Sequence, residues 1–87
     1  MDRIICSVYR SRRKQDVYIY LDHEEGFTRI PDDLRAELGN LDKAMTIILT
    51  PERRLARSNA QAVMAAIREQ GYYLQLPPLH PHDEQLC

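Results

Sequence analysis

Basic and aromatic side chains gather near the start of the chain, where a polar segment separates two apolar stretches. The set consists of Tyr9, Tyr18 and Tyr20 together with Arg10, Arg12, Arg13 and Lys14. Tyrosine rings stack on nucleobases and cations meet phosphates, so these residues have the composition of a platform for single-stranded nucleic acid. We favour a plainer arrangement, in which the tyrosines pack beneath a helix and the cations form a solvated turn.

A second candidate surface lies further along the chain. Tyr73 and Gln75 are two residues apart in a predicted strand, so their side chains point to the same face. Together with Phe27 or Arg29 they could anchor a protein partner, because aromatic and arginine side chains are favoured at interfaces. The alternative is that this strand only closes the sheet and that the two prolines after it protect an edge.

Catalytic and metal-binding chemistry has little support in the sequence. The serines lack a Gly-x-Ser-x-Gly setting, and each glycine is explained by a turn or a helix end, which leaves none for a phosphate-cradling loop. Metal-ligand residue types occur at 22–24 and as His80, His82, Asp83 and Cys87, but neither group has the spacing of a structural zinc site. We therefore predict that the protein is not an enzyme and has no catalytic residue, cofactor or metal.

Composition narrows the class of protein further. The 87 residues fit one domain, and 44% hydrophobic with 29% charged residues is unlike a disordered or fibrous chain. A net charge of −1 excludes a uniformly basic nucleic-acid binder, although two basic blocks flank an acidic one. No apolar run is long enough to cross a bilayer or to act in a signal peptide. With two cysteines far apart, we expect a cytoplasmic protein with reduced thiols and, by default, a monomer.

The first structural elements must position the basic and aromatic set. Alternating apolar residues predict a hairpin with strands over 4–9 and 17–21, closed by the polar segment 10–16. One face of this hairpin is expected to carry Ile4, Cys6, Val8, Val17, Ile19 and Leu21, and the other face the three tyrosines.

Helix-end signals place two helices after the hairpin. Pro31, followed by two aspartates, begins the first helix, and Gly39 ends it. Ser58, with a glutamine three residues later, has the spacing of a capping box and starts the second helix, unless that helix begins as early as Pro51. Gly71 ends the second helix.

Two more strands complete the predicted fold. The run 44–50 is apolar at most positions, which is typical of a central strand covered on both faces, and 72–76 forms the last strand. The order ββαβαβ predicts an α/β two-layer sandwich with a mainly antiparallel or mixed four-stranded sheet. Both helices could lie on one face of the sheet, or one on each. The single domain covers 1–78, and 79–87 is expected to be a flexible tail.

The residues 69–78 read EQGYYLQLPP, and this run closely resembles the closing motif of the YcgL-like family of small gammaproteobacterial proteins. Upstream elements agree in order; they are Tyr9-Arg10-Ser11, Tyr18-Ile19-Tyr20, Phe27-Thr28-Arg29-Ile30-Pro31, Met45 and Arg53-Arg54-Leu55. The resemblance covers about residues 4–78. It implies a compact α/β domain in the cytoplasm, and it brings no established activity, cofactor or catalytic residue.

These observations together predict a non-enzymatic binding domain, most simply a protein-interaction or accessory module. The expected contacts with a protein partner are Arg10, Arg12, Arg13, Tyr73 and Gln75. The alternative is an accessory protein that binds RNA or single-stranded nucleic acid through Tyr9, Tyr18, Tyr20 and Lys14 with the basic hairpin tip.

Overall fold

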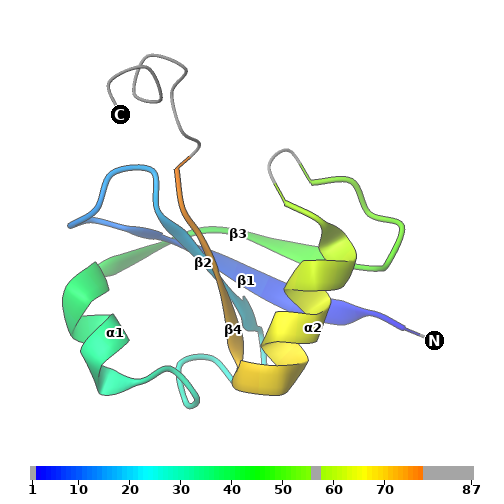
Figure 1. Cartoon of the computed structure of the whole chain (residues 1–87), viewed down its shortest axis with the longest axis horizontal. Helices are drawn as coiled ribbons and strands as arrows, with labels where there is room; N and C mark the ends of the chain where they lie inside the picture. Colours follow the sequence, from blue (N-terminus) through cyan, green and yellow to red (C-terminus); the bar gives the residue numbers. More distant parts are fainter. Residues whose placement is uncertain (1, 56–57, 78–87) are drawn as a thin grey trace, which may run out of the picture.

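The fold consists of a single antiparallel sheet and two helices. The computed structural model describes residues 2–55 and 58–77. Within them lie β1 (Ile4–Ser11), β2 (Tyr18–Asp22), α1 (Asp32–Leu38), β3 (Leu41–Leu49), α2 (Ala60–Gln70) and β4 (Tyr72–Gln75). The strands pair in the order β3-β1-β2-β4 (Figure 1). The α/β class and the order ββαβαβ are confirmed, and every strand pair is antiparallel.

Each face of the sheet carries one helix. Figure 1 shows α1 and α2 on either side of β4, and their separate buried clusters place one helix on each face, which is one of the two arrangements expected from the sequence. On the α2 face the buried core consists of Ile4, Cys6, Val8, Tyr20, Leu49, Val63, Met64 and Ile67. On the α1 face it consists of Val17, Ile19, Leu21, Ile30 and Leu38. Burial of apolar surface on both faces stabilises a sheet that neither short helix could cover alone.

The hairpin register differs from the expected one. Val8 lies opposite Tyr20, and Tyr9 lies opposite Ile19. Tyr18 and Tyr20 therefore share the α2 face with Val8, while Tyr9 lies on the α1 face. A shift of one residue in register moves every side chain of a strand to the other face, and this shift makes the predicted grouping of the three tyrosines wrong.

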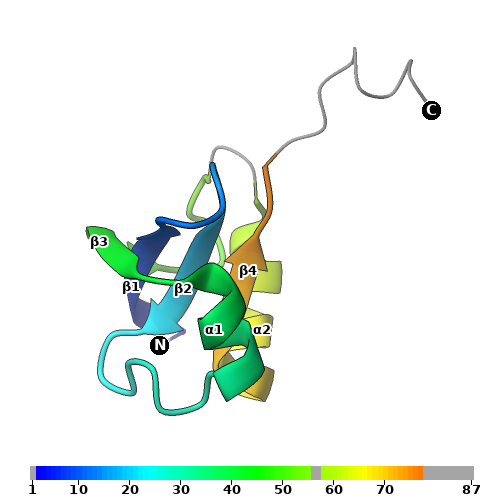
Figure 2. The same ribbon diagram turned by 90° about the vertical axis from the view of Figure 1, so that its left-hand side faces the viewer.

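The strand β3 lies at an edge of the sheet, so the prediction of a central strand is wrong. Figure 2 shows β3 at one edge and β4 at the other. Met45 is 52% exposed and Ile48 is 47% exposed, on opposite faces of the strand. The register with β1 shifts between Val8 and Tyr9, and such a bulge twists an edge strand. The apolar run 44–50 therefore belongs to an edge strand whose faces the helices cover only in part.

The ends of both helices follow the sequence signals closely. Helix α1 begins after Pro31 with two aspartates in its first turn and ends before Gly39. Helix α2 begins one residue later than predicted, because the side chain of Asn59, not Ser58, accepts a hydrogen bond from the backbone N–H of Ala62 at 3.1 Å. In the part of the chain that the structure describes, neither helix is long and apolar enough to span a membrane. The predicted tail, 79–87, lies outside the described residues.

Candidate binding site

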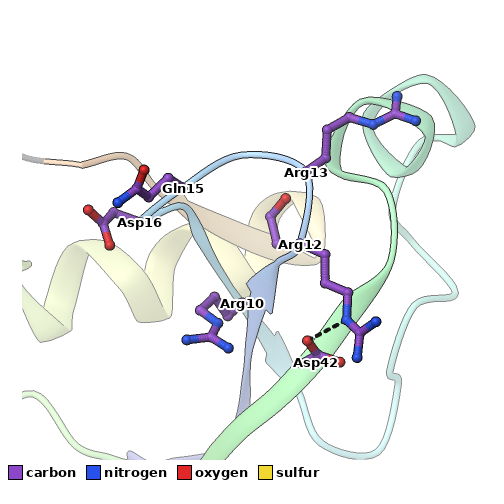
Figure 3. A pocket seen from close by; sticks show the side chains of 7 residues that line it. Arg10, Arg12, Arg13, Gln15, Asp16 and Asp42 are labelled. Carbon is purple, nitrogen blue, oxygen red and sulfur yellow. Dashed lines mark hydrogen bonds and ion pairs between the residues drawn. The ribbon is translucent and has the colours of Figure 1, made fainter.

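The tip of the β1–β2 hairpin forms an open hollow of about 720 Å³. Its lining consists of Arg10, Ser11, Arg12, Arg13, Gln15, Asp16 and Asp42. Figure 3 shows that the three arginines do not converge: Arg12 points to Asp42, and Arg13 points away toward α1. This arrangement does not gather the cations around one point where an anion could sit.

Two of these arginines are engaged by groups of the protein itself. Arg12 Nε donates to Asp42 Oδ2 at 2.7 Å, and Arg13 Nη1 donates to the carbonyl of Ala36 at 3.2 Å. The hydrogen bond from Arg12 lowers the pKa of the Asp42 carboxyl. The backbone N–H of Arg12 also donates to the carbonyl of Asn40 at 2.9 Å. These contacts tie the hairpin tip to the connection between α1 and β3, which is a structural role.

The predicted pair Tyr73 and Gln75 belongs to the packing between β2, β4 and the start of α2. Gln75 is only 8% exposed, and its Oε1 accepts hydrogen bonds from Tyr20 Oη at 3.0 Å and Ser58 Oγ at 2.8 Å. The ring of Tyr73 is half-buried and meets the ring of Tyr20 edge-on, with centroids 5.8 Å apart. Gln75 is therefore not an exposed contact residue, because its amide is used inside the protein.

Phe27 and Arg29 do not join that pair. The ring of Phe27 packs on Tyr9 at the α1 face, with centroids 4.9 Å apart. The guanidinium of Arg29 donates to the carbonyls of Arg68 and Glu69 at the end of α2. The docking surface expected from the sequence is thus divided between two faces of the sheet and a helix end.

A different hollow lies on the α2 face of the sheet, between β3 and the segment before α2. Its volume is about 290 Å³, and its lining consists of Val8, Tyr18, Tyr20, Met45, Ile47, Arg53, Arg54, Leu55 and Gln75. Helix α2 begins only at Ala60, next to the Ser58–Gln75 contact, and packs on the part of the face far from the hairpin tip. The part of this face that none of the described residues covers, which we call the α2-face groove, has a floor that is mainly apolar and aromatic.

Cations surround the α2-face groove. Arg53 and Arg54 line it directly, and a neighbouring hollow of about 200 Å³ that also contacts Tyr18 is lined by Arg10 and Lys43. Arg53 Nη1 donates to the carbonyl of Ile48 at 3.3 Å. Within residues 2–55 and 58–77, the side chains of Arg10, Lys43 and Arg54 make no hydrogen bond or ion pair.

The acidic counterpart of these cations is already engaged. Asp42 is the acidic residue that lines the neighbouring hollow; its carboxylate accepts the hydrogen bond from Arg12 and also interacts electrostatically with Arg10. This leaves Lys43, Arg53 and Arg54 without an acidic partner in the lining. The groove and its surroundings therefore have positive charge that the lining does not neutralise, although the whole chain has a net charge of −1. Such a surface attracts anionic groups.

Only part of this site could be predicted from the sequence. Tyr18, Tyr20, Gln75 and Arg10 were among the predicted residues, and the structure places them at or beside the groove. Met45, Ile47 and Arg54 were missed, because pairing of β3 with β1 brings them from a distant part of the sequence. The sequence feature that could have indicated this site is the adjacent pair Arg53 and Arg54, just after β3. Lys14, at the exposed hairpin tip, does not line the groove.

Two nucleophilic side chains of β1, Ser7 and Cys6, are buried. Ser7 Oγ lies 2.7 Å from His23 Nδ1, but Ser7 is only 3% exposed. Burial raises the pKa of the Cys6 thiol to about 12, so the reactive thiolate is scarce near neutral pH. Among the described residues, no three His, Cys, Asp or Glu side chains are grouped as metal ligands. The candidate ligands His80, His82, Asp83 and Cys87 lie outside the described residues.

The fold defines a small α/β domain with an antiparallel sheet between two helices. The chain belongs to the YcgL domain family, whose model matches residues 6–78. It is 45% identical to a YcgL domain-containing protein of Stutzerimonas stutzeri over 76 residues, which is 87% of this chain and 78% of the relative. A relative from Azotobacter vinelandii is 39% identical over 82 residues, covering 94% of this chain and 82% of the relative. The family resemblance seen in the sequence is confirmed.

Proposed function

We propose that this protein is a non-enzymatic protein-interaction module that docks a partner in the α2-face groove. The observation that carries the proposal is an apolar hollow left open beside α2, with Met45 52% exposed at its β3 side. Exposed apolar surface rimmed by polar residues is typical of interaction sites. The site is built from β1, β2, β3, β4 and the segment after β3, so its shape depends on the whole fold. We place this interaction in the cytoplasm, where the free thiol of Cys6 stays reduced.

Packing of the tyrosines favours a protein partner over a nucleic acid. Tyr9 lies on the α1 face, and Tyr20 is only 8% exposed. Only Tyr18 of the predicted platform remains half-buried beside the groove, whereas sequence-tolerant binding of single strands uses successive aromatic rings. A hydrophobic floor with a polar rim matches the anatomy of a protein interface.

RNA binding is the second candidate function, and one observation favours it. Arg10, Lys43 and Arg54 surround Tyr18, so a phosphate backbone would meet several cations close to one aromatic ring. Such binding would depend strongly on salt, and captured partners would disappear when nucleic acid is digested.

Affinity capture with matched variants tests the proposed function. Tagged wild type, Met45→Asp and Ile5→Asp are used on host lysate, each with and without nuclease. Ile5 is 45% exposed on the opposite face of the sheet, so its substitution controls for an added surface charge. We expect a specific protein that is retained by wild type and Ile5→Asp, is lost with Met45→Asp and resists nuclease. Equal capture by all three forms would refute the groove as the docking site, and loss on digestion would favour RNA.

A further inference from the structure

Resting on that proposed function, we infer that the docked segment is an extended acidic peptide with an apolar anchor. The anchor enters the α2-face groove, and acidic side chains on both sides of it meet the surrounding cations. This assigns a ligand chemistry to the site: carboxylates at the ends and one or two aliphatic side chains in the middle.

The volume and lining of the groove specify the anchor. At about 290 Å³ the groove is slightly smaller than the range of roughly 300–1,000 Å³ that accommodates drug-sized ligands. Apolar side chains from β1, β3 and the segment before α2 form most of its floor; they are Val8, Met45, Ile47 and Leu55. Burial of a leucine-sized side chain against such a floor is favourable, whereas a polar side chain would lose its hydrogen bonds to water there without replacement.

The order of residues along β3 specifies an extended occupant. Lys43 and Ala44 line the smaller hollow, and Met45 and Ile47 line the groove, so the two hollows follow one another along this strand. A peptide rises about 3.3 Å per residue when extended, so consecutive residues of an occupant pass from one hollow to the other.

The cations lie toward both ends of this path. Arg10 and Lys43 line the hollow toward the start of β3. Arg53 lies at the end of β3, where its guanidinium donates to the carbonyl of Ile48, and Arg54 lines the groove directly. An anchor between them has positive charge on either side. Acidic residues flanking the anchor therefore complement the rim, while a basic peptide would be repelled.

Fluorescence polarisation with the full-length protein tests this inference. The probe is a short labelled peptide with a Leu-Leu centre and aspartates on both sides. Two further probes replace either the aspartates by asparagines or the leucines by serines. Several exposed ion pairs together correspond to about tenfold in affinity, so we expect the acidic probe to bind about tenfold more tightly than its asparagine counterpart. Added salt should reduce this ratio.

Matched charge variants locate the binding. Lys43→Gln and Arg54→Gln should each weaken the acidic probe about two- to fivefold, in line with the loss of one exposed ion pair. Arg3→Gln removes an exposed cation that does not line either hollow and should leave the affinity unchanged. Equal losses in all three variants would overturn the assigned site.

The outcomes separate the ligand chemistry from the proposed function. Equal binding of the acidic and asparagine probes, or binding of neither, would overturn the acidic-peptide inference. The proposed function would still stand if Met45→Asp selectively abolished capture of a protein. Tighter binding of single-stranded oligouridine at the same site, lost in Lys43→Gln and Arg54→Gln, would overturn the inference in favour of RNA. The serine probe should also bind more weakly than the leucine probe. Equal binding of these two probes would show that no apolar side chain is held on the floor of the groove, and would overturn the inference.

Discussion

Tyr20 and Gln75 are joined by a hydrogen bond between neighbouring strands, in which Tyr20 Oη donates to Gln75 Oε1 at 3.0 Å. The same oxygen accepts a hydrogen bond from Ser58 just before α2 begins, at 2.8 Å. One amide therefore connects β2, β4 and the entry to α2 at the edge of the α2-face groove. The shared acceptor explains why a polar side chain is buried there.

Replacing Gln75 by Leu should destabilise the fold. The substitution removes an acceptor used by two buried or half-buried hydroxyls, and such a loss costs about 1–3 kcal/mol. Urea unfolding monitored by circular dichroism measures the change. Gln61→Leu, at an exposed position of α2, is the matched control and should change the free energy of unfolding by no more than about 0.5 kcal/mol. Equal stability of the two variants would contradict the structural role of Gln75.

Gly71→Ala should be more destabilising than Gly26→Ala. Both glycines have positive φ, at 94° and 58°, and a left-handed conformation costs other residues about 1–2 kcal/mol. At Gly71 the Arg29 side chain also occupies the space of an added Cβ, whereas nothing lies within 4 Å at Gly26. Thermal and urea unfolding of both variants measure the difference. Gly71→Ala should cost less in an Arg29→Gly background, which lacks the Arg29 Cβ that the added methyl group meets, and an equal cost in both backgrounds would refute the steric explanation.

Acid should weaken the contact between Arg12 and Asp42. The hydrogen bond from Arg12 lowers the pKa of Asp42 in the folded state, so its contribution to stability is present above the pKa of the unfolded chain. The contribution is lost as the pH falls through the lowered pKa, where the carboxyl becomes protonated. Urea unfolding of wild type and Asp42→Asn across the acidic range checks this. The stability curves should converge at low pH, and a constant separation would show that the charge of Asp42 is irrelevant.

Cys6 should resist alkylation as long as the protein is folded. Its thiol is buried, and burial raises its pKa to about 12. In a Cys87→Ser variant, which leaves Cys6 as the remaining thiol, iodoacetamide should react only as fast as the protein unfolds. Mass spectrometry with and without urea measures this reaction. Rapid modification in native buffer would mean that the α2-face core opens far more readily than its packing indicates.

The helices and strands of this fold could be predicted because the residues that begin and end them lie within a few positions of one another in the sequence. Gly39 and Gly71 end their helices, and the acidic first turn of α1 follows Pro31 as expected. The order of elements and the antiparallel tendency followed from these signals and from the alternation of apolar residues. The family motif at 69–78 was equally visible, since it is continuous in the sequence.

The faces of the sheet could not be predicted in the same way. The side of β2 on which Tyr18 lies depends on the turn between the strands, where Asp16 adopts a φ of 61° and the N–H of Ser11 meets the carbonyl of Val17. Alternation alone is compatible with either register. The α2-face groove could not be predicted for a related reason. Met45 and Arg54 lie near Tyr18 only because β3 pairs with β1 at the edge of the sheet, and this pairing joins distant parts of the sequence.

Site-specific photo-crosslinking in living host cells tests the central claim most directly. A benzophenone side chain replaces Met45 in one strain and Ile5 in another, which places the same probe on opposite faces of the sheet. The docking account predicts a discrete crosslinked protein from position 45 that is absent from position 5 and unaffected by nuclease. Crosslinks of equal yield at both positions, or crosslinks to RNA at position 45, would contradict it.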